Sequence, residues 1–306
     1  TNYALYHKGK LLEEMFNSPQ TWGTRGLVLN FSSGDSPRME TMYNSDLFFE
    51  MGHMNAAFRC AFNNLTREGK SYQNLKRIAE CNMVNGNYEL AEKYLNLLDK
   101  TFFHKEFAKR YKTIIADTEA RDRCFAELRT QLPAVELNLY LSNFVPLLTL
   151  LISNPHNRMA FDYLTAWFLL DKASLPLIGE NIQHLREAGY ISIPTHYQEA
   201  LMGWETGSGR TIDLHGFTYD EDTTSRFKRF TQQVSQDLSK QEVQRQLESA
   251  FGGTYMYYYF FVSDMPSVSG SGAMSEIHYH LGNALMSQGK PKEAAAHYRQ
   301  MLVTAP

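Results

Sequence analysis

The side chains of this sequence that could bind a metal or transfer protons are its histidines and cysteines. His278 and His280 are two residues apart, so on a helix of 3.6 residues per turn they point about 200° away from each other and cannot bind one metal ion. Cys60, Cys81 and Cys124 lack the Cys-x-x-Cys spacing that is typical of metal and redox sites. We therefore predict no metal and no cofactor, and we expect Cys60 and Cys81 to be buried apolar residues.

An acidic cluster and a glycine-rich segment are two further candidates for chemistry. Asp220, Glu221 and Asp222 have no calcium-loop spacing, so we interpret Asp222 or a following Thr as the cap of a helix. The segment GSGR at 207–210 lacks the Lys-Ser/Thr ending of a phosphate loop and reads as a turn. With no nucleophile or acid/base constellation, the sequence predicts no catalytic residue and no enzyme.

The elements of the chain follow from a repeat. Gly52 and Gly86 are 34 residues apart, as are Ala57 and Ala91, and the pattern returns at 289 and 294. A period of 34 is the length of a tetratricopeptide helix-turn-helix unit, whose helices bury their apolar faces by stacking on neighbours. We predict an all-α fold, a right-handed α-solenoid of tetratricopeptide-like helix pairs.

Each unit is expected to have small residues where its two helices cross and a glycine in a left-handed turn between them. The units that begin at Arg38 and Tyr72 have Ser45 and Ala79 at the first crossing position. The clearest unit lies at the end of the chain. The predicted domains are a solenoid over 1–262, a Ser/Gly/Pro linker over 263–273, and a C-terminal repeat over 274–306 that packs on the solenoid or caps it.

Outside the clear repeats, apolar spacing predicts helices over Tyr3–Phe16 and Ser174–Ala188, and residues 203–222 read as irregular. Tyr255–Phe261 holds four tyrosines and two phenylalanines, which cover every face of a helix. This aromatic run is either core or a platform for stacking sugars or a partner helix.

Composition limits the partners. The chain has 306 residues, 43% hydrophobic and 21% charged, and its net charge of -3 offers no basic face for nucleic acid. The longest apolar run, Phe144–Ile152, contains Pro146 and is about half of the roughly 20 residues that a bilayer requires. We expect no nucleic-acid partner and no transmembrane segment in this chain.

The inner surface of such a solenoid is formed by the second, fifth, ninth and twelfth positions of each first helix. Methionine and phenylalanine mixed with single charges at these positions favour an adaptable groove for a peptide or helix. The predicted partner-binding residues are Met39, Met42, Asp46, Phe49, Gln73, Lys76, Glu80, Met83, Glu276, Tyr279, Asn283 and Met286.

Three stretches carry a family resemblance: FFEMGHMNAAFRCAFNN, NRMAFDYLTAWFLLDK and GGTYMYYYFF. They resemble the soluble region of an uncharacterised family of Bacteroidetes membrane proteins, a domain of unknown function with tetratricopeptide-like repeats. The resemblance implies a bundle of transmembrane helices outside this chain and a place in the bacterial cell envelope, on either side of the membrane. It implies no activity and no catalytic residue.

These observations favour a non-enzymatic scaffold that binds a protein or peptide in a concave groove. The alternative is glycan or small-ligand binding through exposed aromatic residues, as in tetratricopeptide-based outer-membrane glycan receptors. A terminal repeat without a polar capping helix would expose its apolar face, which favours a homodimer.

Overall fold

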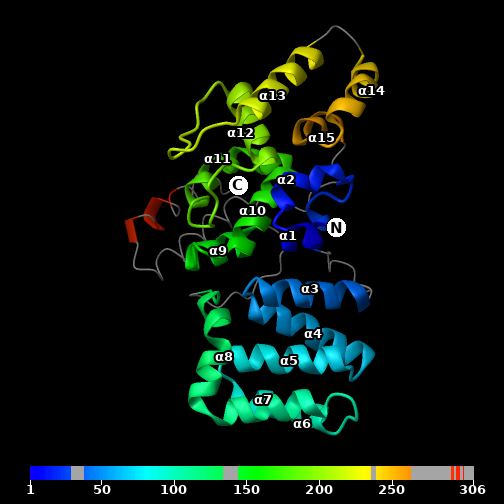
Figure 1. The fold of residues 1–306 in the computed structure, drawn as a ribbon, viewed down its shortest axis with the longest axis vertical. Helices are drawn as coiled ribbons and strands as arrows, with labels where there is room; N and C mark the ends of the chain where they lie inside the picture. The colour runs from blue at the N-terminus through cyan, green and yellow to red at the C-terminus, as the bar shows by residue number, and fades with distance from the viewer. Residues whose placement is uncertain are drawn as a thin grey trace. The chain divides into compact units, whose positions relative to one another are not determined.

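A computed structural model describes residues 1–28, 38–133, 144–235 and 239–262, with single positions between 291 and 299. Every element in these ranges is helical, as predicted (Figure 1). The chain divides into two compact units, each built from two separate segments. One comprises Thr1–Leu27 with Arg158–Val268, and the other comprises Val28–Asn157 with Ser269–Pro306.

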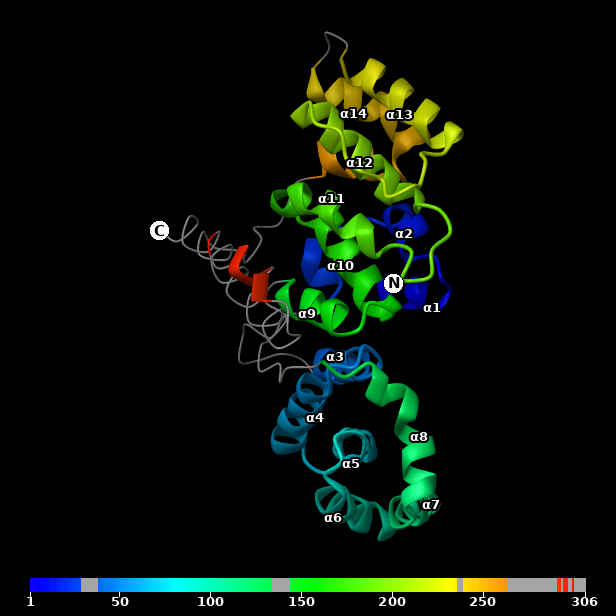
Figure 2. The ribbon, with the colours of Figure 1, turned by 90° about the vertical axis from the view of Figure 1, so that its left-hand side faces the viewer.

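The second unit contains the clear repeats. Its helices from α3 to α8 pack in chain order, each on the next, and α5 also contacts α3 and α8. Figure 2 views α5 end-on, with the other five around it. The helices are α3 (Arg38–Glu50), α4 (Met54–Glu68), α5 (Tyr72–Val84), α6 (Tyr88–Asp99), α7 (Lys105–Ala116), α8 (Thr118–Thr130) and α9 (Val145–Ser153).

The predicted glycine turns are confirmed. Gly52 and Gly86 have φ of 86° and 80°, a left-handed conformation that glycine adopts without strain. After each glycine, the next N–H reaches back five residues: His53 donates to the Phe48 carbonyl, and Asn87 to the Asn82 carbonyl, both at 2.8 Å. This is the Schellman ending of a helix, and it turns the chain from the first helix of a pair into the second.

The crossing positions are also confirmed as small and buried. Ala57, Ala79 and Ala91 are completely buried, and the Ser45 hydroxyl donates to the Ala57 carbonyl at 2.9 Å. Because Ser45 is on α3 and Ala57 is on α4, this bond joins the two helices where they meet. Cys60 and Cys81 are buried free cysteines, as expected.

The first unit is built around α10, whose residues from Met159 to Leu170 are all buried. Helix α2 contacts both α10 and α12, and α12 contacts α13 and α15. The N-terminal segment thus packs on helices that follow it by more than 140 residues. The α-helices are α1 (Asn2–His7), α2 (Leu11–Glu14), α10 (Arg158–Leu170), α11 (Ile178–Asn181), α12 (Thr195–Ser208), α13 (Glu221–Val234), α14 (Lys240–Phe251) and α15 (Tyr255–Phe261), with 3₁₀ turns at Met15–Asn17, Gly23–Gly26, Lys172–Leu177 and Ile182–His184.

Three expectations for this unit were wrong in detail. The helix predicted over Tyr3–Phe16 is broken between α1 and α2, because Gly9 has φ of 67° and makes the same Schellman ending as Gly52. The helix predicted over Ser174–Ala188 consists of 3₁₀ turns and the short α11, because Pro176 has no N–H to donate. The region from residue 203 is helical as far as Ser208, where Gly209 ends α12 with φ of 67°.

Candidate functional site

The predicted groove residues of α3 and α5 lie on two helices in contact. Their side chains differ in exposure: Asp46 and Gln73 are exposed, while Met42, Phe49, Lys76 and Glu80 are half-buried. We call these six residues the α3–α5 face. The side chain of Met39 and the four predicted positions of the last repeat, Glu276, Tyr279, Asn283 and Met286, lie outside the described residues.

Met83 differs from the other predicted positions because its side chain is completely buried. Its carbonyl, with that of Val84, accepts hydrogen bonds from Arg129 of α8, at 3.4 and 3.2 Å. Helix α8 therefore covers the C-terminal end of α5. Met83 belongs to the interior of the helix stack and offers no surface to a partner.

Arg77 organises the α3–α5 face, although the repeat positions did not select it. Its Nη2 donates to Asp46 Oδ1 at 2.6 Å, and its guanidinium carbon lies 3.9 Å from the centre of the Phe49 ring. Nη1 lies 3.2 Å from Glu80 Oε2, an ion pair without hydrogen-bond alignment. One cation thus joins α3 to α5 through charge and ring contacts. The i, i+3 spacing of Arg77 and Glu80 is the sequence signal that could have found it.

Helix α7 extends this face with aromatic side chains. Lys76 Nζ lies 5.6 Å from the centre of the Phe107 ring, and Phe107 contacts Tyr111 with ring centres 4.6 Å apart. Burial raises the pKa of the Glu80 carboxyl, and the charges of Arg77 and Lys76 oppose this shift. A carboxylate held between two cations beside aromatic rings is a site for polar and aromatic contacts.

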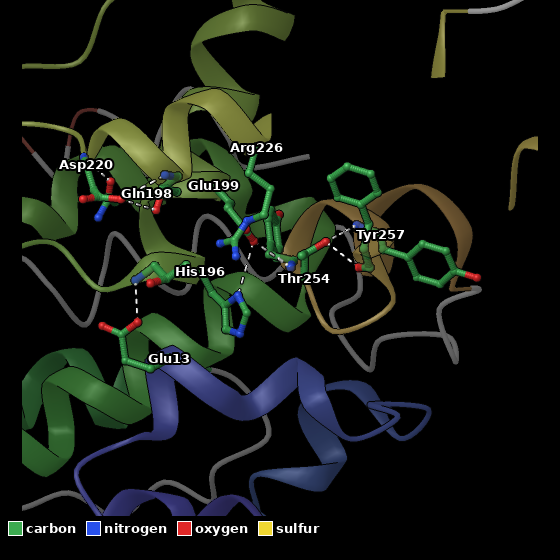
Figure 3. Close-up of polar contacts among 12 residues, drawn as sticks. Glu13, His196, Gln198, Glu199, Asp220, Arg226, Thr254 and Tyr257 are labelled. Carbon is green, nitrogen blue, oxygen red and sulfur yellow. Dashed lines mark hydrogen bonds and ion pairs between the residues drawn. The ribbon is translucent and has the colours of Figure 1, made fainter. Parts of the chain in front are cut away.

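A second polar cluster lies in the first unit, around the completely buried Glu199 (Figure 3). Its Oε1 accepts from Arg226 Nη2 at 2.8 Å, and its Oε2 accepts from the Tyr255 N–H at 2.8 Å. The same Oε2 lies 3.3 Å from Nδ1 of His196, whose ring packs edge-on against Phe16. One carboxylate therefore ties α12 to α13 and α15.

The entry to α12 is fixed by two further contacts, also drawn in Figure 3. Glu13 on α2 accepts from the Thr195 N–H at 2.9 Å, and Gln198 accepts from the Asp220 N–H at 2.7 Å. Asp220 itself caps α13 by accepting from the Thr223 N–H at 2.9 Å. The capping interpretation of the acidic cluster is confirmed, but the capping residue is Asp220 instead of Asp222 or a following Thr.

The aromatic run of α15 is mainly core. Tyr255, Tyr257 and Tyr258 are buried, whereas Tyr259 and Phe260 are exposed by 37% and 43%. The Tyr258 hydroxyl donates to the Leu170 carbonyl at 3.0 Å, so this ring is tied to α10. The run therefore presents two exposed rings, Tyr259 and Phe260, instead of the broad stacking platform that sugar binding would use.

Two further expectations concern membrane spans and metal sites within the described ranges. No helix there is long and apolar enough to cross a membrane. No three side chains among His, Cys, Asp and Glu come together there in a group that could hold a metal ion.

Two protein families match different parts of the chain. Residues 275–306 match the tetratricopeptide repeat, which suggests a role in protein interaction. Residues 1–262 match the family of unknown function DUF6057, and the chain belongs to that family. No curated protein and no solved structure matches the chain.

Proposed function

We propose that this chain is a non-enzymatic interaction scaffold that binds a peptide or helix of a partner protein on the α3–α5 face. The observation that carries this proposal is the array around Arg77, which holds Asp46, Phe49 and Glu80 in one surface across two helices. Such a surface offers both charges and an aromatic ring to an amphipathic segment. Because Asp46 is 56% exposed, one end of the array is open to a partner cation.

We infer that the described pairs form part of a right-handed tetratricopeptide-like solenoid with this face on its concave side. In support, α3 and α5 begin 34 residues apart, end in the same glycine turn and contact each other. In a solenoid of this kind, the first helices of successive pairs line one surface. The predicted residues of the last repeat would continue it.

The proposed setting is the bacterial cell envelope, with the chain tethered by a membrane region that lies outside it. This part rests on the family resemblance of the sequence. A homodimer through the last repeat is also proposed, on the separate ground that terminal repeats without a polar outer face associate. The proposed ligand of the α3–α5 face is a protein, whether or not the chain is tethered to a membrane or forms a homodimer.

The test is site-specific photo-crosslinking followed by titration. A photo-reactive phenylalanine analogue at Gln73, which is exposed on α5, should capture one partner from envelope extract, whereas the analogue at the exposed Glu92 on α6 should not. The purified partner should then bind Met42→Glu at least about tenfold more weakly than the wild type, because a charge enters an apolar contact.

Leu90→Glu is the matched control, since it places the same charge on a partly exposed apolar position of α6. We expect this variant to bind within about twofold of the wild type. Equal losses in Met42→Glu and Leu90→Glu, or capture of the same species from Gln73 and Glu92, would overturn the assignment of the face.

A further inference from the structure

The turn that joins α6 to α7 exposes two adjacent phenylalanines. Phe102 is 82% exposed and Phe103 is 84% exposed, and their rings meet edge to face with centres 5.1 Å apart. The turn closes the helix hairpin formed by α6 and α7 (Figure 1). Exposing such large apolar side chains to water is unfavourable. Their exposure therefore indicates a surface that a membrane or another molecule covers.

The backbone of this turn is held by specific bonds. Thr101 donates its hydroxyl to the Leu98 carbonyl at 2.7 Å and accepts from the His104 N–H at 3.2 Å. The His104 ring stacks on Tyr72 with centres 3.7 Å apart. An ion pair also joins the two helices, since Lys112 Nζ on α7 lies 2.7 Å from Oδ2 of Asp99, the last residue of α6. The two rings are thus presented outward by a turn that is fixed on both sides.

Positive charge predominates in the sequence around the exposed rings. Residues 99–112 contain five Lys or Arg and two Asp or Glu, a local charge of +3 in a chain whose net charge is -3. Lys100 and Lys105 directly flank the turn and are exposed. Aromatic side chains that enter a bilayer interface while flanking lysines meet anionic headgroups are a recognised mode of peripheral membrane binding.

We propose that the α6–α7 turn is a membrane-docking element that inserts Phe102 and Phe103 into the interface of an anionic bilayer, with Lys100 and Lys105 at the headgroups. Charge complementarity favours an anionic lipid surface, because the exposed Lys100 and Lys105 flank the rings and Glu106 is the single acid among residues 100–112. This site is separate from the α3–α5 face and does not depend on its function.

The test is flotation of the full chain with vesicles of phosphatidylcholine containing about one-third phosphatidylglycerol, an anionic surface that attracts basic residues. The wild type should float with these vesicles and much less with pure phosphatidylcholine. Phe102→Ser with Phe103→Ser should lower the partition coefficient at least about tenfold. Lys100→Gln with Lys105→Gln should lower it about fivefold or more, and added salt should weaken the wild type similarly.

Ile191→Ser is the matched control, because Ile191 is 96% exposed but lies in the other unit. It should bind vesicles within about twofold of the wild type. In addition, the fluorescence of Phe103→Trp should be quenched by brominated lipid more strongly than that of Ile191→Trp. The proposal fails if the wild type does not float with anionic vesicles, if the Phe variant floats equally well, or if Ile191→Ser loses as much.

Discussion

Asp162 shows what burial does to a single carboxyl group. It lies on α10 at 2% exposure, where its Oδ1 accepts from the Tyr190 hydroxyl at 2.8 Å and its Oδ2 lies 3.8 Å from Arg158 Nε. Burial raises the pKa of Asp162 from 3.8 to about 6, while the Tyr190 bond and the Arg158 charge oppose the shift. The folded chain therefore holds this proton more tightly than the unfolded chain does.

Asp162→Asn should remove a pH dependence from folding. With the pKa raised in the folded state, protonation of Asp162 favours folding as pH falls from about 6 to about 4, and ionisation disfavours it above about 6. Asn keeps an acceptor for Tyr190 and does not ionise. We expect the variant to gain stability relative to the wild type as pH rises through this window, by up to a few kcal/mol, measured by urea unfolding at pH 4.5, 6 and 7.5.

Asp220→Asn provides a comparison, because its effect on stability should change with pH in the opposite direction to that of Asp162→Asn. The pKa of the exposed Asp220 is lowered, mainly because it accepts from the Thr223 N–H, so its charge stabilises the fold above the unfolded pKa and that contribution is lost as pH falls. If the stability of both variants relative to the wild type changed with pH in the same direction, the role of burial at Asp162 would be contradicted.

At the scale of the element, Glu199 determines how three helices meet. Glu199→Ala leaves the Arg226 guanidinium and the Tyr255 N–H without their buried acceptor. Since breaking a buried ion pair on one side costs about 3–5 kcal/mol, and the Arg226 side chain is 33% exposed, we expect a loss near the lower end. The loss is measured as the difference in the free energy of chemical unfolding between Glu199→Ala and the wild type.

Glu221→Ala is the control for this variant, because Glu221 is an exposed acid in the first turn of α13. Its removal should change stability by less than about 1 kcal/mol. A change of that size in Glu199→Ala would show that the buried carboxylate does not join these helices.

Elements set by local pattern could be predicted from the sequence. The units from Arg38 and Tyr72 coincide with the starts of α3 and α5, because periodicity and glycine turns act within a few residues. The break at Gly9 was missed since the apolar pattern continues across it, although the same residue type was read correctly at Gly52.

The candidate site depends on contacts that no local pattern encodes. Arg77 bonds Asp46 across 31 positions, and Glu199 accepts from Tyr255 across 56. A repeat template selects positions by their offset within one helix, and it therefore returned Met83, which is buried once α8 covers the end of α5. The groove assignment as a whole stays a prediction.

At the scale of the whole molecule, the first unit needs both of its segments. Leu11, Leu12, Met15 and Phe16 are buried in it, so residues 158–262 alone would expose the surfaces that these side chains cover. We expect a fragment of 158–262 to lack a cooperative thermal transition and to gain one when a peptide of residues 1–27 is added. Circular dichroism during heating measures this.

A peptide with Leu12→Asp and Met15→Asp should not restore the transition, because charges would enter the core. A fragment that melts cooperatively without any peptide would show that the N-terminal segment is dispensable for this unit.

The division of the first unit also sets an order of events at the ribosome. Residues 1–27 emerge before the rest of their unit, and α10 begins roughly 130 residues later, which at about 5–20 residues per second is a delay of some 7–26 seconds. During that delay, helices α3 to α8 can form their own contacts. The apolar N-terminal segment meanwhile has no native surface to cover it, so chaperone occupancy on the nascent chain should be highest there and should fall when α12 leaves the exit tunnel.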